Sequence, residues 1–127
     1  MHIGILFYSE SLNSTRSPGE IKGRLLANES FVKALLKYSN EPVTLIVSSQ
    51  AEVDFLQSYF NPSPPHLICH LYQLSELLAN NPLDIIHIQS PNLFRACYLR
   101  DQLNTKTAAV TGITHSLSSA PFQEWIY

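Results

Sequence analysis

The 127-residue sequence has few charged residues. They make up 14% of it, and the eight lysines and arginines, against ten acidic residues, are scattered along the chain. The net charge of −2 leaves no basic stripe to neutralise phosphates, which excludes a dedicated nucleic-acid binder. The low number of charged residues also indicates that part of the surface is covered by, or shared with, another part of a protein.

Long apolar runs and targeting signals are missing as well. The first residues lead directly into apolar sequence without a basic n-region, and no apolar run reaches the roughly 20 residues that a membrane-spanning helix needs. We therefore expect a cytoplasmic protein with no transmembrane segment, while peripheral membrane association stays open. The two cysteines, Cys69 and Cys97, fall in different expected elements, and we expect both to be reduced, buried thiols.

One apolar stretch, residues 83–91 (LDIIHIQSP), organises the rest of the chain. Its nearly continuous, mostly β-branched residues predict a strand buried on both faces of a parallel sheet, and we take it as the central strand. His87 and Gln89 lie two residues apart near its end and so share one face. Because ligands of open α/β sheets bind beyond the carboxyl ends of strands, we expect the end of this strand to form the floor of a site.

Strand-like and helix-like stretches alternate along the whole chain, which predicts parallel pairing with right-handed crossovers. The fold class is therefore α/β, as one Rossmann-like domain over residues 1–127. We expect a three-layer sandwich whose parallel sheet has the order 3-2-1-4-5, with the topological switch between the first and fourth strands. The strands are expected over 2–8, 43–48, 66–71, 83–91 and 107–114, and the helices over 23–38, 50–60, 73–80 and 92–103.

Residue spacing also predicts how the helices are oriented. In the first helix, Glu29 and Lys33 lie four residues apart on the expected wet face. In the short helix over 73–80, we expect Leu74, Leu77 and Leu78 to point inward.

If the strand order holds, three loops meet at one rim, over residues 9–22, 89–91 and 115–118. The first is longer than the usual two to six residues or so of a βα connection, and it leads into a helix whose free N–H groups can bind an anion. Gly19 and Gly23 would let the backbone approach a phosphate closely. The alternative, that these glycines serve only the turns of the loop, is equally compatible with the composition.

Two histidines lie near this rim. His115 follows the fifth strand directly, between Thr114 and Ser116. Taken alone, such a rim histidine is more often structural or merely exposed than catalytic. His87 lies deeper in its strand, and we expect a buried neutral histidine hydrogen-bonded to a backbone carbonyl.

Several site signatures are absent. The sequence has no GxGxxG after the first strand, no GxxxxGK[ST] and no GxSxG, which leaves dinucleotide binding, a P-loop and hydrolase chemistry without support. His66, Cys69 and His70 have the composition of a metal cluster. Strand alternation, however, places Cys69 opposite the two histidines, and no further cysteine pair completes a set. We expect neither a metal nor a cofactor.

The order of these segments resembles a known family. Together, five segments look like the N-terminal half of a family 4 glycosyltransferase of the GT-B fold. They are HIGILFY, a glycine-containing loop that leads into GRLLANESFVKALLKYS, PVTLIVS, DIIHIQSP and AAVTGITHSLSS. The resemblance covers essentially the whole chain. It implies transfer of a glycosyl group from a diphosphonucleotide donor to an acceptor, with retention of configuration and usually without a bound metal.

The resemblance also implies roles for particular residues. Gly23 matches the second glycine of the family loop, which lies near the donor diphosphate. His115 matches the histidine of the family's TxH motif, which contacts the transferred sugar. His87 matches the first histidine of the family's DVVHxH strand. The sequence departs from the family pattern at Gln89, where a second histidine usually stands, and at Lys22, where a first glycine does. The expected catalytic residue is His115, and the expected substrate-binding residues are Gly19, Gly23, Gln89, Ser90 and Ser116.

We therefore expect the acceptor-side domain of a retaining glycosyltransferase, present as a fragment, since family members carry a second, donor-binding domain. Its expected partners are a nucleotide-sugar donor and a glycosyl acceptor, whether small molecule, glycan or lipid-linked, and no nucleic acid. Two alternatives stay open. One is a flavodoxin-like module whose Ser/Thr-rich first loop holds an FMN phosphate, and the other is a non-catalytic interaction domain of the same fold.

Overall fold

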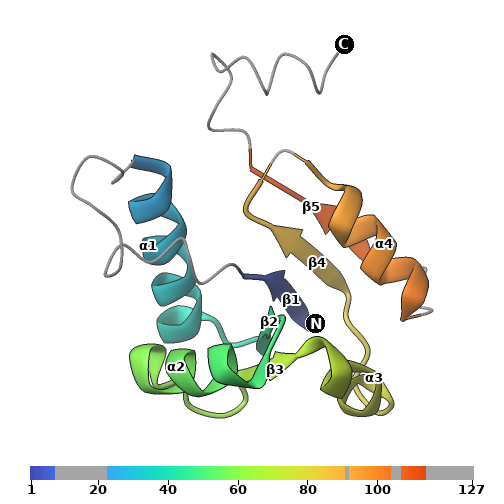
Figure 1. Cartoon of the computed structure of the whole chain (residues 1–127), viewed down its shortest axis with the longest axis horizontal. Coiled ribbons are helices and arrows are strands. Elements are labelled where there is room, and N and C mark those ends of the chain that lie inside the picture. Colours follow the sequence, from blue (N-terminus) through green and yellow to red (C-terminus); the bar gives the residue numbers. More distant parts are fainter. Residues whose placement is uncertain (8–22, 91, 104–106, 114–127) are drawn as a thin grey trace.

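The structure, a computed structural model, describes residues 1–7, 23–90, 92–103 and 107–113. Strands and helices alternate along these residues from first to last (Figure 1). The elements are β1 (Ile3–Leu6), α1 (Gly23–Tyr38), β2 (Val43–Val47), α2 (Gln50–Phe60), β3 (Leu67–His70), α3 (Leu71–Leu78), β4 (Ile85–Ile88), α4 (Phe94–Gln102) and β5 (Ala109–Thr111).

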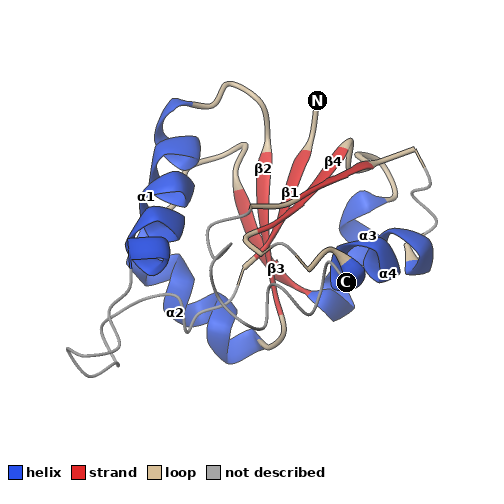
Figure 2. Cartoon of the chain, turned by 90° about the horizontal axis from the view of Figure 1, so that it is seen from above, coloured by secondary structure: helices blue, strands red, loops and turns tan. Residues whose placement is uncertain are grey.

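All five strands pair in parallel, in the order β3-β2-β1-β4-β5. The predicted α/β fold, sheet order and parallel pairing are confirmed, and the fold is Rossmann-like. Seen from above, α1 and α2 cover one face of the sheet, and α3 and α4 cover the other (Figure 2). The chain changes face between β1 and β4, which are hydrogen-bonded neighbours, so the switch point lies where it was expected.

The prediction that residues 83–91 form the central strand is wrong. β1 occupies the centre of the sheet, and β4 lies beside it. β2, not β4, is the strand in which every residue is buried. In β4, Ile86 and Ile88 are buried towards α3 and α4, whereas Ile85 and His87 on the other face are only half-buried. The apolar run alone did not distinguish these cases, because isoleucine also occurs at a half-buried position such as Ile85.

Two hydrophobic clusters hold the layers together, because successive residues of a strand point to opposite faces. In β2, Leu45 packs under α1 and α2, and its neighbour Ile46 packs under α3 and α4. Both side chains are almost fully buried, as is Val32 of α1. Fully burying side chains of this size stabilises the fold by about 1.5–3 kcal/mol each.

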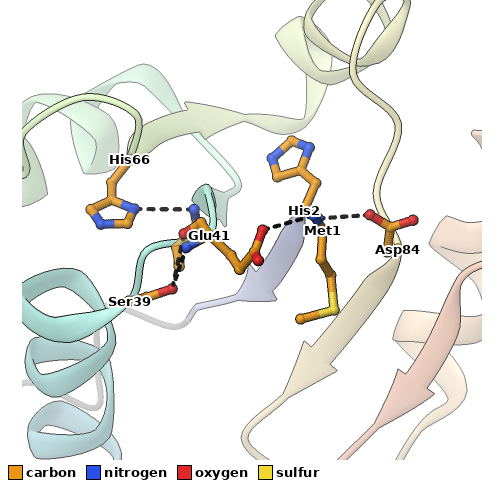
Figure 3. A network of polar contacts seen from close by, with 7 residues as sticks. Met1, His2, Ser39, Glu41, His66 and Asp84 are labelled. Atoms are coloured by element: carbon orange, nitrogen blue, oxygen red, sulfur yellow. Dashed lines mark hydrogen bonds and ion pairs between the residues drawn. The ribbon is translucent and has the colours of Figure 1, made fainter.

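The amino edge of the sheet is fixed by a polar network (Figure 3). The ammonium group of Met1 pairs with Glu41 at 2.7 Å, and the N–H of His2 donates to Asp84 Oδ2 at 2.7 Å. The main chain of Asp84 donates to the His2 carbonyl at 2.8 Å and accepts from Ala109 N–H at 2.9 Å. Asp84 therefore joins the starts of β1, β4 and β5, which gives the aspartate at the head of DIIHI a structural role.

The helix boundaries follow from their caps. α2 begins after Ser49, whose hydroxyl accepts from the N–H of Glu52, and ends at Asn61, which adopts the left-handed conformation with φ 46°. α3 begins at Leu71, two residues earlier than predicted, because His70 caps it by accepting from the N–H of Tyr72 at 3.2 Å.

The prediction that Leu77 points inward is wrong, since 42% of its surface is exposed. α3 is only eight residues long and buries a single row, Leu74 and Leu78. Leu77 lies about 100° from Leu78 around the helix axis and so leaves that row. In α1, Lys33 approaches Glu29 at 3.8 Å, as the four-residue spacing predicted.

The two cysteines are free thiols in different elements, as expected. Cys69 is buried, and burial raises the pKa of its thiol to about 11, so that it stays protonated. Cys97 is only half-buried, so the prediction of two buried thiols holds for one of them. No helix among the described residues is long and apolar enough to cross a membrane.

Candidate functional site

The carboxyl ends of β1 and β4 and the start of α1 lie close together. Gln89 follows β4, is only 7% exposed, and donates from Nε2 to the main-chain oxygen of Asn28 at 3.0 Å. Asn28 belongs to the second turn of α1 and is 5% exposed. This contact holds the first turns of α1 over the end of β4. It also shows that His87 and Gln89 share the face that looks towards α1, as their spacing predicted.

The start of α1 has the electrostatics of an anion site. The main-chain N–H groups of a first helical turn have no partners within the helix and carry partial positive charge. The first turn of α1, which begins at Gly23, contains no acidic residue that would neutralise this charge. Asn28 Oδ1 is buried nearby without a hydrogen-bond partner among the described residues, which leaves an acceptor between α1 and the sheet.

His87 lies one step deeper beneath α1. Its Nδ1 is 2.8 Å from Thr111 Oγ1 of β5, and its ring lies 5.2 Å from the ring of Phe31, centroid to centroid. Burial lowers the pKa of His87, so the ring is neutral at pH 7. The lowered pKa agrees with the predicted neutral form, but His87 is half-buried and not buried, and its partner is a side-chain hydroxyl and not the predicted backbone carbonyl.

The unused nitrogen of His87 indicates its tautomer. Nε2 is buried and has no hydrogen-bond partner among the described residues. A buried N–H without an acceptor costs about 1–3 kcal/mol, and we therefore assign the proton to Nδ1, which donates to Thr111. Nε2 then carries the lone pair of the ring.

Ser90 is held between β4, α4 and β5. Its hydroxyl oxygen accepts from the N–H of Asn92 at 3.1 Å, and its carbonyl accepts from the N–H of Ile113 at 3.3 Å. Gly112 allows this approach, because a Cβ there would lie 2.5 Å from the Ser90 carbonyl oxygen and 2.5 Å from Leu93 Cδ2. Among the described residues, the hydroxyl of Ser90 is seen only as an acceptor, so its proton could donate to a ligand.

A cavity of about 970 Å³ opens at the same edge, between α3 and α4. Its floor is formed by Leu6 of β1 and Ile46 of β2, which belong to the core cluster beneath those helices. Two rows of residues spaced four apart on α4 line one wall, since such residues share a face of a helix. These rows are Phe94, Tyr98 and Gln102, and Arg95, Leu99 and Leu103.

The rim of the cavity is aromatic and largely uncharged. Tyr72 of α3 and Phe94 and Tyr98 of α4 are 90%, 72% and 59% exposed, and the last two rings stack at 6.4 Å with 22° between their planes. Among the described lining residues, the charged side chains are Glu52 and Arg95. The Glu52 carboxylate accepts from the hydroxyl of Ser48 at 2.5 Å.

Only some of the expected site residues belong to the part of the chain that the structure describes. Gln89 and Ser90 follow β4 at the carboxyl edge, and Gln89 contacts the second turn of α1, the helix that Gly23 begins, whereas Gly19, His115 and Ser116 lie outside the described residues. Sequence reasoning missed Asn28, Thr111 and Gly112, which position the expected residues, and it missed the cavity. The signal for the cavity was the aromatic pair Phe94 and Tyr98, spaced four apart on a helix whose buried residue is Ala96.

The three residues with metal-ligand chemistry are separated in the structure. His66 accepts at Nδ1 from the N–H of Val43 at 3.1 Å, His70 caps α3, and Cys69 belongs to the core under α3 and α4. Within the described ranges, no three histidine, cysteine or acidic side chains lie close enough to bind one metal ion.

Comparison with known proteins gives no relatives, since no protein-family model, curated protein or solved structure gives a significant match to this chain.

Proposed function

We propose that this chain is the acceptor-side domain of a nucleotide-sugar-dependent, retaining glycosyltransferase. The observation that carries the proposal is the switch point between β1 and β4. There the start of α1, the end of β4 and the cavity between α3 and α4 meet at one carboxyl edge. This is the edge at which open α/β sheets bind their ligands.

The chemistry follows from what such a reaction requires. The bond between the anomeric carbon and the diphosphate oxygen breaks, and its electron pair leaves with the nucleotide diphosphate. The oxygen of an acceptor hydroxyl forms the new bond to the anomeric carbon on the same face of the sugar, and its proton passes to the departing diphosphate oxygen. The protein must hold donor and acceptor in register and stabilise the charge that develops on the leaving diphosphate.

Residues at the carboxyl edge suit these tasks. The free N–H groups at the start of α1, at Gly23, would face the leaving diphosphate. Gln89 acts through its bond to Asn28, which keeps that helix end over β4. The hydroxyl proton of Ser90 would reach a sugar hydroxyl, and His115 would contact the transferred sugar, as the resemblance implies. A second domain would bind the nucleoside part of the donor, while its diphosphate would contact the start of α1 of this chain, and transfer is expected only when that domain is present.

The proposal is tested by titrating the ¹⁵N-labelled chain with UDP-glucose and GDP-mannose and following its amide signals by NMR. Shifts confined to the first turn of α1 and to Ser90 are expected. Gln89→Leu should weaken this binding, because α1 loses its contact with β4. Gln57→Leu makes the same chemical change at an exposed position of α2 and is the matched control.

Two results would overturn the proposal. One is FMN binding at the same amides with a yellow protein, which would establish the flavodoxin-like alternative. The other is that neither nucleotide sugar shifts any signal of the carboxyl edge, which would leave a non-catalytic interaction domain.

A further inference from the structure

The cavity between α3 and α4 has a chemistry different from that of the α1 side of the same edge. Figure 2 shows α1 and α2 on one face of the sheet and α3 and α4 on the other. The cavity, lined by residues of α3 and α4, therefore lies on the face opposite α1. On the α1 side are the start of a helix without acidic residues in its first turn and buried polar side chains. On the α3–α4 side are aliphatic side chains at the bottom, aromatic rings at the rim and few charges.

The cavity is a poor site for a nucleotide diphosphate. Among its described lining residues, one guanidinium, that of Arg95, is balanced by one carboxylate, that of Glu52, so the wall carries no net positive charge. A diphosphate needs several donors and cations to replace its hydration. The floor of Leu6 and Ile46 offers none.

The same walls suit an uncharged, ring-containing molecule. A volume of about 970 Å³ is at the upper end of small-molecule sites, and such sites are mainly apolar with a few polar groups. Phe94 and Tyr98 on α4 and Tyr72 on α3 present rings to the same opening. Aromatic side chains stack on planar rings, and the hydroxyl of Ser75 on α3 lies along the same wall to fix their orientation.

We propose that this cavity binds the apolar, aromatic part of the glycosyl acceptor, with the acceptor hydroxyl directed past the end of β1 towards the donor. The identification of the bound molecule as the glycosyl acceptor rests on the proposed function. The binding of an uncharged aromatic hydroxyl compound to the cavity does not depend on it. The anionic donor and the neutral acceptor would then bind on opposite faces of one sheet.

The experiment measures binding of 2-naphthol, an uncharged aromatic alcohol, by calorimetry and by NMR of the 127-residue chain. Binding is expected to shift amides of α3 and α4. Phe94→Ala and Tyr98→Ala should each raise the Kd roughly tenfold, since each removes a ring from the wall. Ser75→Trp, which fills the cavity from an exposed position, should abolish binding without removing any core side chain.

The chain provides a matched control on another helix. Phe55 and Tyr59 of α2 form a second exposed aromatic pair, four residues apart, that stacks at 5.8 Å with 24° between the rings. Neither residue lines the cavity. Phe55→Ala should therefore leave the Kd for 2-naphthol unchanged. An equal loss in Phe55→Ala and Phe94→Ala would mean that exposed rings bind the probe non-specifically, and it would overturn the inference.

Further arms separate this inference from the proposed function. 2-Naphthyl phosphate should bind at least roughly tenfold more weakly than 2-naphthol, and UDP should not displace 2-naphthol. Displacement by UDP would make the cavity the nucleotide site and would overturn the inference alone. Specific 2-naphthol binding in a protein that binds no nucleotide sugar would overturn the proposed function and leave an aromatic-alcohol site standing.

Discussion

Replacement of Gly112 by alanine is a sharp test of how the carboxyl edge is built. Gly112 follows β5 and is itself exposed, so that composition and burial alone would predict a harmless substitution. The added Cβ would lie 2.5 Å from the main-chain oxygen of Ser90 and 2.5 Å from Leu93 Cδ2. The Ser90 carbonyl cannot rotate away as a side chain would, because it belongs to the turn after β4 and accepts from Ile113 N–H.

The magnitude follows from comparison with Gly4. A Cβ at Gly4 would lie 2.8 Å and 3.0 Å from the two terminal methyl groups of Leu83 and 3.3 Å from Ile46 Cδ1, all ends of flexible side chains. Overpacking costs about 1–3 kcal/mol, and the gain from a stiffer unfolded chain offsets about 0.4–1 kcal/mol of it. We expect Gly112→Ala to lower the free energy of unfolding by about 2 kcal/mol and Gly4→Ala by about 1 kcal/mol or less.

Urea denaturation followed by circular dichroism measures both changes, provided that the slope with denaturant stays constant. For a chain of this length, a loss of 2 kcal/mol should also lower Tm by about 6–10 °C. Stability of Gly112→Ala within about 0.5 kcal/mol of the parent would refute the reasoning. It would mean that the β4 and β5 ends are not as close as described.

Three further predictions concern other parts of the chain. Burial lowers the pKa of His87 below 6.5, so the unfolded chain binds a proton more readily than the folded one. The free energy of unfolding should therefore fall as the pH drops below about 6.5. The urea midpoint of His87→Gln, whose side chain does not titrate, should fall less over the same pH range. His115→Ala in the full-length gene product should lower sugar-transfer turnover by roughly 10²-fold without lowering Tm, and near-normal turnover would remove His115 from the site. Asn61→Gly should leave the Tm unchanged or raise it slightly, while Asn61→Val should lower it, because φ at this position is 46° and a β-branched residue is strained there.

Much of the fold was predictable because its determinants are local. The helices Gly23–Tyr38 and Gln50–Phe60 begin and end where the sequence predicts, since apolar periodicity and polar end signals agree there. Parallel pairing followed from the alternation of elements, and the strand order followed from the handedness of crossovers. The start of α3 was missed because its cap is His70, a residue type outside the usual capping set of Ser, Thr, Asp and Asn.

The candidate site was less predictable because its geometry depends on contacts between distant residues. The face shared by His87 and Gln89 follows from strand periodicity and was predicted. Their partners, Thr111 on β5 and Asn28 on α1, lie 24 and 61 residues away in the chain, and no local pattern indicates them. The cavity was not predicted for a related reason. It depends on the distance between the short helix α3 and α4, which together enclose the space next to Leu6 and Ile46.

The switch point explains why one edge of this sheet offers two kinds of surface. β1 is followed by a helix on one face and β4 by a helix on the other, so the helices diverge at the β1–β4 boundary. On the α1 face, the helix start and the polar end of β4 come together, since Gln89 needs a partner once it is buried. On the opposite face, α3 has only eight residues, and the core residues Leu6 and Ile46 line the bottom of the cavity beside it. A helix start and an apolar recess thus lie on either side of one strand end. Under the proposed function, this arrangement would let a charged donor and a neutral acceptor meet without competing for one site.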